Sequence, residues 1–174
     1  MPPTYLQNPL VQKVLNAKKD YFNIPENELV ITQIMRCHFK PEDTVEGVSK
    51  CITGQGLHTD GSDAAMIMIL ERENIKGAAN FFTYDIEGTQ YDEDMKSQTY
   101  QVGDVLLWED NAIYHDVSRA ELLDPTKEGH RAILVTNYPA AHYIEGTTNP
   151  NNTLKTRIES DDLKLRQSAD DYNN

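Results

Sequence analysis

Between residues 29 and 138 the chain is a series of short segments with the length and composition of β-strands. Residues 29–39 (LVITQIMRCHF) alternate and are rich in β-branched side chains, and residues 64–72 (AAMIMILER) form an apolar run of strand length. Similar segments occupy residues 78–85, 100–108, 113–118 and 131–138. About six or seven short strands with little helix between them favour two packed antiparallel sheets, a jelly roll or barrel, over a βαβ fold.

One short helix is expected before these strands. Residues 8–21 begin with Asn8-Pro9 and carry apolar side chains at helical spacing, and Asn23-Ile24-Pro25 ends the segment. We interpret residues 40–55, 73–77 and 120–129 as loops, turns or polar connections. Residues 1–144 are expected to form a single domain. Residues 145–174 are expected to be a polar, mobile tail with one short helix around residues 160–167.

Charge and cysteine content narrow the class of protein. The net charge is −12 and no lysine- or arginine-rich run occurs, which argues against a nucleic-acid partner. Cys37 and Cys51 are isolated and lack the spacing of a metal motif. The first residues do not resemble a secretory signal, and the longest apolar run, residues 64–70, is too short to cross a bilayer. We therefore expect a cytoplasmic protein without membrane contact.

Three widely spaced elements point to chemistry: His58-Thr59-Asp60, His115 and Arg131. A single His-x-Asp is weak evidence, because a chain with 28 acids and five histidines has about even odds of one by chance. Its placement is more specific, since residues two apart on an extended segment project to the same side. Two imidazoles and one carboxylate suit a non-haem Fe(II) with open positions, and an arginine suits a carboxylate-bearing cosubstrate.

Each of these residues also has an ordinary structural interpretation. His58 fits a loop histidine, and Asp60 before a glycine fits a turn cap. His115 next to Asp116 fits a surface pair, and Asp116 itself is expected to be exposed. Arg131 alternates with apolar residues, so it needs a partner in the interior, either a bound anion or an internal salt bridge.

The blocks GLHTDGSD, LERENIKGAANFF, QVGDVLLWEDNAIYHDVS and GHRAILVTNYP resemble, in this order, those of one small subfamily of 2-oxoglutarate/Fe(II)-dependent dioxygenases. That subfamily includes bacterial L-isoleucine dioxygenase, and the resemblance covers roughly residues 31–139. It implies a mainly β, double-stranded β-helix fold of the jelly-roll or cupin-like kind. It also implies hydroxylation of a small substrate, the side chain of a free amino acid, with Fe(II), O₂ and 2-oxoglutarate consumed to succinate and CO₂.

Position by position, His58, Asp60 and His115 resemble the iron ligands, and Arg131 resembles the residue that pairs with the distal carboxylate of 2-oxoglutarate. Arg72 lies in a block shared with the family, and Arg36 resembles an arginine on the family's first strand. We expect Arg72 first and Arg36 second to be the substrate-binding residues. The alternative for Arg72 is a pair with a nearby acid, and His38 shares a strand face with Arg36, so either of those two could line the pocket.

Other assignments rest on the strand pattern alone. Asn80 and Tyr84 share one face of their strand with Phe82, and we expect either to hydrogen-bond the cosubstrate. Phe82 and Trp108 are expected to be core residues. His130 and His142 have no partners at ligand spacing and are interpreted as structural or surface histidines.

Two departures from the family pattern bear on the substrate. Ala79 stands where relatives carry an acid, which argues against isoleucine itself. The chain is also shorter at its N-terminus, so we expect an open pocket or one completed by a second subunit of a homo-oligomer. Three alternatives remain: a cupin-like metal enzyme that uses no 2-oxoglutarate, a peptide or protein hydroxylase, and a non-catalytic sugar-binding jelly roll.

Overall fold

The structure, a computed structural model, describes residues 3–45, 48–49 and 56–140. Residues 145–174, where a tail with one helix around residues 160–167 is expected, lie outside the described part, as do Cys51 and His142. The elements are, in chain order, α1 (Pro3–Leu6), α2 (Pro9–Tyr21), β1 (Ile31–Phe39), η1 (Pro41–Asp43), β2 (Thr44–Val45), β3 (Val48–Ser49), β4 (Ala64–Glu73), β5 (Ile75–Gly77), β6 (Asn80–Thr83), η2 (Glu93–Met95), β7 (Val105–Trp108), β8 (Tyr114–Val117), β9 (Ala120–Leu122) and β10 (Gly129–Tyr138).

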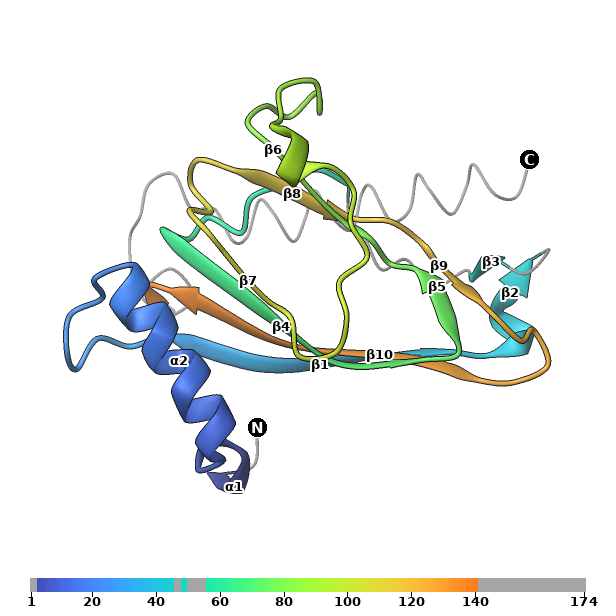
Figure 1. Cartoon of the computed structure of the whole chain (residues 1–174), viewed down its shortest axis with the longest axis horizontal. Coiled ribbons are helices and arrows are strands. Elements are labelled where there is room, and N and C mark those ends of the chain that lie inside the picture. The colour runs from blue at the N-terminus through green and yellow to red at the C-terminus, as the bar shows by residue number, and fades with distance from the viewer. Residues whose placement is uncertain (1–2, 46–47, 50–55, 141–174) are drawn as a thin grey trace.

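The strands form antiparallel sheets arranged in two layers. The larger sheet has the order β1-β10-β4-β7 and forms the lower layer in Figure 1. Strands β6 and β8 pair above it, and a sheet of order β2-β3-β9-β5 lies to the right. This arrangement is a mainly β jelly roll, as the sequence predicts.

Strand β4 lacks an alternating pattern because both of its faces are covered. Ala65, Ile67 and Ile69 are buried in one cluster with Phe82 and Trp108, between the two layers. On the opposite face Met66 and Met68 are buried with Val11 of α2 and Leu134 of β10. A strand buried on both faces appears in sequence as a continuous apolar run.

The N-terminal helix confirms the sequence prediction closely. The side-chain oxygen of Asn8 accepts a hydrogen bond from the backbone N–H of Leu10 at 2.9 Å, and Pro9 occupies the first turn, where no intrahelical donor is needed. Lys18 and Lys19 lie in the last turn, where positive charge is favourable. The helix lies below the larger sheet in Figure 1 and covers its outer face.

Four short strands fall in segments that the sequence assigns to loops, turns or connections. Strands β2 and β3 lie within residues 40–55, β5 lies within residues 73–77, and β9 lies within residues 120–129. Each has only two or three residues, which is too short for a period-two pattern to be recognised. Strands β5 and β9 are nevertheless well fixed, because Ile75 pairs with Leu122 and both are buried against Phe39.

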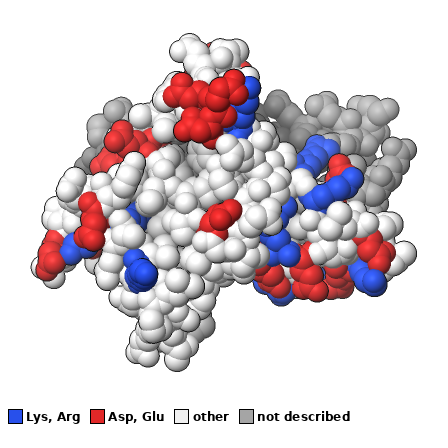
Figure 2. All heavy atoms as spheres, viewed as in Figure 1, with Lys and Arg blue, Asp and Glu red and all other residues white. Residues whose placement is uncertain are grey.

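The surface carries mixed charge. Figure 2 shows acidic side chains gathered at the top, over the projecting segment that follows β6. The sequence places Asp85, Glu87 and Asp92 in the loop between β6 and η2, and Glu93 and Asp94 in η2. Within the described residues, no helix is long and apolar enough to cross a membrane.

Candidate active site

The two histidines of the predicted metal site are joined directly by their backbones. The N–H of His58 donates to the carbonyl oxygen of His115 at 3.1 Å, and the N–H of His115 donates to the carbonyl oxygen of His58 at 2.9 Å. Directly opposed residues of an antiparallel pair project their side chains to the same face. The two imidazole centroids lie 4.3 Å apart.

Asp60 completes a group of three candidate metal ligands. Its Oδ1 lies 3.6 Å from His58 Nε2 and its Oδ2 lies 3.9 Å from His115 Nε2. Two atoms that each bind the same ion at about 2 Å are separated by at most about 4 Å. All three side chains are half-buried, and one ligand atom from each lies within 4.8 Å of the others. The group therefore has the composition and spacing to hold one divalent ion.

Neighbouring hydrogen bonds orient two of these ligands. His58 Nδ1 lies 2.7 Å from the carbonyl oxygen of Gly56. Because a carbonyl only accepts, Nδ1 carries the proton, and the lone pair of a neutral ring is left on Nε2 towards Asp60. The side-chain N–H of Asn137 donates to Asp60 Oδ2 at 3.0 Å. Such outer contacts fix the ligand atoms before metal arrives.

A second aspartate, Asp110, holds the site from behind. Its fully buried carboxylate accepts from the backbone N–H groups of Asp60 at 3.0 Å and Ser62 at 2.9 Å, and from the indole N–H of Trp108 at 3.2 Å. Its Oδ1 lies 3.5 Å from His115 Nδ1. Burial raises the pKa of Asp110. The hydrogen bonds that its carboxylate accepts from backbone N–H groups oppose that rise.

Sequence reasoning missed both Asp110 and Asn137. The available signal is the position of Asp110, two residues after the end of an apolar strand and five residues before His115. From that position the buried Asp110 carboxylate reaches the segment that carries His58 and Asp60 and also the ring of His115.

The three ligands open into a cavity of about 240 Å³ between the layers. Its polar lining includes Asn80 and Arg131, and Trp108 forms part of the wall. The remaining lining residues are Met35, Cys37, Ile67, Asp116, Val117, Ile133 and Val135. A mostly apolar cavity with a few convergent polar groups is typical of small-molecule sites.

Arg131 is a buried cation in this cavity. It is 4% exposed, and among the described residues its guanidinium makes one hydrogen bond, from Nη2 to Asn80 Oδ1 at 3.4 Å. Its Nε is shielded from solvent without a hydrogen-bond partner, and no carboxylate of the described residues lies within ion-pair distance. Burial lowers the pKa of Arg131, with a further contribution from the charge of Arg72, yet an arginine keeps its charge. The arrangement fits a bound anion.

Arg72 reaches the same region because of a bulge in β4. Alternation alone would place Arg72 on the face of Met66 and Met68, beneath α2. The register with β10 shifts between Ala132 and Ile133, so Arg72 stands opposite Arg131. An extra residue in one strand moves all later side chains to the other face.

The guanidinium of Arg72 is held by backbone carbonyl groups. It donates to Gly77 O at 2.7 Å and to Ala78 O at 3.4 Å, and burial lowers its pKa. No ion pair with a carboxylate is formed by Arg72 among the described residues.

Two further predicted site residues lie elsewhere. Arg36 is exposed, and its Nε and Nη2 donate to Glu71 at 2.8 and 3.0 Å on the outer face of the larger sheet. Tyr84 is 48% exposed and donates to Asp92 at 2.8 Å. Neither residue lines the cavity, and Arg72 is not among its lining residues either. Of the predicted cosubstrate and substrate residues, Asn80 and Arg131 are those that line it together with the candidate metal ligands. Asp116, expected to be exposed, is half-buried and borders the cavity.

The sequence profile of one family matches most of the chain. The family is described as 2OG-Fe dioxygenase, and the match covers residues 1–137. No curated protein sequence matches the chain.

Two solved structures have a similar fold. The crystal structure of IDO from Bacillus thuringiensis shares 16% identity with a TM-score of 0.60, and the match covers 78% of this chain and 63% of that one. A bsmA homolog from Methylobium petroleophilum shares 19% identity with a TM-score of 0.58, over 79% of this chain and 53% of that one. The chain thus spans between about half and two thirds of the length of these two proteins. At such low identity the likeness concerns the fold alone.

Proposed function

The chain belongs to the 2OG-Fe dioxygenase family, and we propose that it oxidises a small substrate with Fe(II), O₂ and 2-oxoglutarate. One observation carries the proposal. The same cavity is lined by a group of two histidines and one aspartate and also by a buried arginine. Among the described residues, this arginine has no carboxylate partner. The first is the ligand set of non-haem iron oxygenases, and the second suits an acidic cosubstrate.

His58, Asp60 and His115 would hold the iron, and their outer contacts suit that role. The Nε2 atoms of both histidines face Asp60, and hydrogen bonds from Asn137 and to Gly56 keep the donors oriented. Bound there, Fe(II) supplies the redox chemistry that couples decarboxylation of 2-oxoglutarate to oxidation of a C–H bond. Arg131 would fix the distal carboxylate of 2-oxoglutarate, while Asn80 holds the guanidinium from the side.

The class of substrate is inferred from the remaining cavity. About 240 Å³ is below the usual range for drug-sized ligands, so cosubstrate and substrate together must be small. Ile67, Ile133 and Val135 offer an apolar wall for an aliphatic side chain. Arg72 is not among the residues that line the cavity, but it stands opposite Arg131 and is held by backbone carbonyl groups, so it is available for a second carboxylate. We infer a free amino acid, hydroxylated on its side chain.

A screen of free amino acids tests this function. Purified protein with Fe(II), O₂ and 2-oxoglutarate is incubated with each amino acid, and succinate release and a product heavier by one oxygen atom are measured. We expect both signals with at least one aliphatic amino acid, and neither without 2-oxoglutarate. Turnover with a peptide but with no free amino acid would show that the proposed substrate class is wrong, while the iron and cosubstrate assignments would stand. Substrate oxidation that proceeds without 2-oxoglutarate would show that the proposed reaction is wrong.

Arg72 has its own test within the same assay. Arg72→Lys keeps the charge and shortens the hydrogen-bonding reach, so it should raise the KM for the amino acid while the KM for 2-oxoglutarate changes little. The reverse pattern would assign Arg72 to the cosubstrate. Arg36→Lys is the matched control, because Arg36 lies on the outer face and should leave both constants unchanged.

A further inference from the structure

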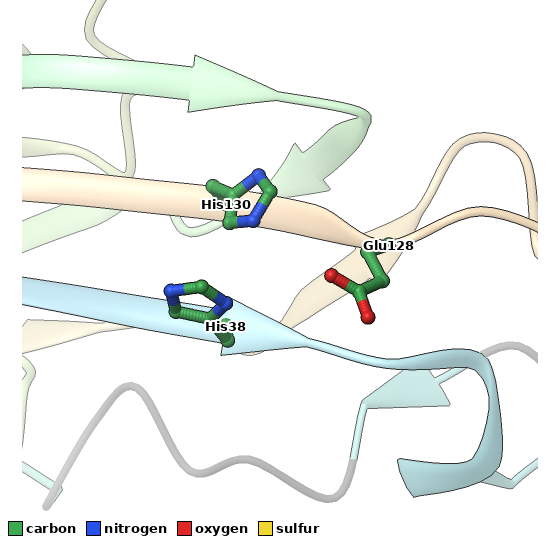
Figure 3. Close-up of side chains that lie close together, drawn as sticks. All are labelled: His38, Glu128 and His130. Carbon is green, nitrogen blue, oxygen red and sulfur yellow. The ribbon is translucent and has the colours of Figure 1, made fainter.

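We propose that the outer face of the larger sheet carries a second metal site, which binds Zn²⁺ through His38, His130 and Glu128. One imidazole nitrogen from each histidine and a carboxylate oxygen of Glu128 lie within 4.8 Å of one another. Figure 3 shows the two rings side by side on β1 and β10, with the Glu128 carboxylate at their end of the sheet. This site is separate from the iron ligands and independent of the proposed reaction.

The strand register creates the histidine pair. His38 and His130 are directly opposed Cα partners, and their rings meet edge to face with centroids 4.6 Å apart. Cys37 and Arg131, the next pair along the same strands, line the cavity, so alternation places the histidines on the opposite face. The backbone therefore fixes two imidazoles beside each other outside the active site.

His130 has a nitrogen whose hydrogen-bonding capacity is unused. Among the described residues, its Nδ1 is shielded from solvent and has no hydrogen-bond partner. Glu73 Oε2 lies 3.5 Å away, an ion pair only when the ring is protonated. His130 is also common to a second group of potential ligands, with Glu71 and Glu73. An imidazole surrounded by three acids is a favourable place for a divalent cation.

Zn²⁺ is the ion that this set of ligands suits best. It accepts imidazole nitrogen and carboxylate oxygen, and with three protein ligands it keeps a water in the fourth position. Both His38 and Glu128 are exposed, so an ion reaches them without any opening of the fold.

Arg36 must yield when the ion binds. Its Nη1 lies 2.9 Å from His38 Nε2, and because a guanidinium only donates, that nitrogen accepts. A metal on Nε2 displaces Arg36 directly, and a metal on Nδ1 forces the ring proton onto Nε2, which also breaks the contact. Glu71 retains Arg36 through two hydrogen bonds in either case. Zinc binding thus exchanges one hydrogen bond for a coordinate bond without leaving the arginine unpaired.

Zinc stoichiometry in four untagged full-length proteins tests the proposal. Isothermal titration with Zn²⁺ should show two sites in the wild type, one in His38→Ala, one in His58→Ala and none in the double variant. His38 is exposed, so its replacement should leave the circular dichroism spectrum unchanged. Two sites remaining in His38→Ala, or a single site in the wild type, would overturn the proposal.

A second comparison distinguishes coordination of Zn²⁺ by Glu128 from a general attraction of Zn²⁺ to the negatively charged protein. In the His58→Ala background, Glu128→Gln should weaken Zn²⁺ binding by about tenfold or more, whereas Glu87→Gln, the same change at an exposed acid of the β6–η2 loop, should not. Zinc at saturating concentration should also raise the Tm of His58→Ala but not of the double variant, because only the folded state offers the site. Equal weakening by both glutamine variants would mean that zinc responds to net charge, and would also overturn the proposal.

Discussion

His58 and His115 exchange two backbone hydrogen bonds, of 3.1 and 2.9 Å, across an antiparallel bridge. The separation of the two imidazoles is therefore set by the main chain and not by packing of the rings. Asp60 is held from the same side, because its backbone N–H donates to Asp110. Removing one ligand side chain should leave the positions of the other two unchanged.

His115→Ala should consequently abolish tight Fe(II) binding without unfolding the protein. Loss of one of three protein ligands is expected to weaken affinity by more than about 100-fold, beyond the usual effect of an outer contact. Anaerobic titration with Fe(II) measures the change, and the circular dichroism spectrum reports the fold. Tyr84→Phe is the control, since Tyr84 lies outside the cavity and its hydroxyl donates to Asp92. Unchanged iron affinity in His115→Ala would remove this residue from the ligand set.

Arg131→Lys should weaken 2-oxoglutarate binding while leaving iron binding intact. Lysine retains the charge but loses the planar pair of donors, so roughly one charge-assisted hydrogen bond, about 1.5–3 kcal/mol, is lost. The Kd for 2-oxoglutarate, measured on the Fe(II)-loaded protein by its absorption change, should rise by roughly ten- to hundredfold. A loss of thermal stability with an unchanged Kd would instead indicate that Arg131 serves only the core.

Asp110→Asn should lower iron affinity although Asp110 touches no metal. Its two oxygens accept from Asp60, Ser62 and Trp108, and an amide has only one accepting oxygen. At least one of these donors then faces an N–H group, and the segment that carries Asp60 must shift. We expect a 10–100-fold rise in the Kd for Fe(II). Asp116→Asn should have a much smaller effect, because the Asp116 side chain, although next to His115, accepts from the N–H of Val117 and from none of the segments that carry Asp60 among the described residues.

The grouping of His58, Asp60 and His115 could be predicted from sequence because it depends on local pattern and chain order. His58 and Asp60 are two residues apart, and His115 lies within a recognisable strand segment. The main strands can be predicted for the same reason, because a strand with one or both faces buried has a recognisable pattern of apolar residues in its sequence.

The positions of Arg72 and Arg36 could not be predicted, because each depends on pairing with another strand. Arg72 faces Arg131 only through the register shift between β4 and β10. Arg36 lies outside because Cys37, not Arg36, stands opposite Arg131. A shift of one residue exchanges the two faces of a strand, and sequence alone does not carry that information.

Buried polar contacts were also outside the reach of sequence analysis. Lys18, in the last turn of α2, is only 2% exposed, and its ammonium group donates to the backbone oxygen and to Oγ1 of Thr136 at 2.9 and 2.7 Å. Helical spacing indicates which face of α2 is apolar. It does not indicate whether a lysine on that face is buried or reaches solvent. Its partner lies 118 residues away.

Lys18 should make folding stability depend on pH in the alkaline range. Burial lowers its pKa to about 7, against a smaller opposing effect of the Asp110 carboxylate. An unfolded lysine titrates near its usual value of about 10.4. Between these two values the unfolded chain binds a proton that the folded protein does not, so the free energy of unfolding rises with pH, by up to about 1.4 kcal/mol per pH unit. Below about pH 7 both states are protonated and this contribution is flat.

Lys18→Met should remove that rise, because methionine fills a similar volume without a titrating group. Urea denaturation of both proteins between about pH 6 and pH 9 gives the difference in unfolding free energy, in which the effects of all other groups cancel. The wild type should gain stability relative to Lys18→Met only above about pH 7. Lys19→Met is the matched control, since Lys19 is adjacent in sequence but partly exposed and paired with Glu26. Parallel pH profiles for the wild type and Lys18→Met would mean that the buried amine keeps its proton through this range, held by the charge of Asp110.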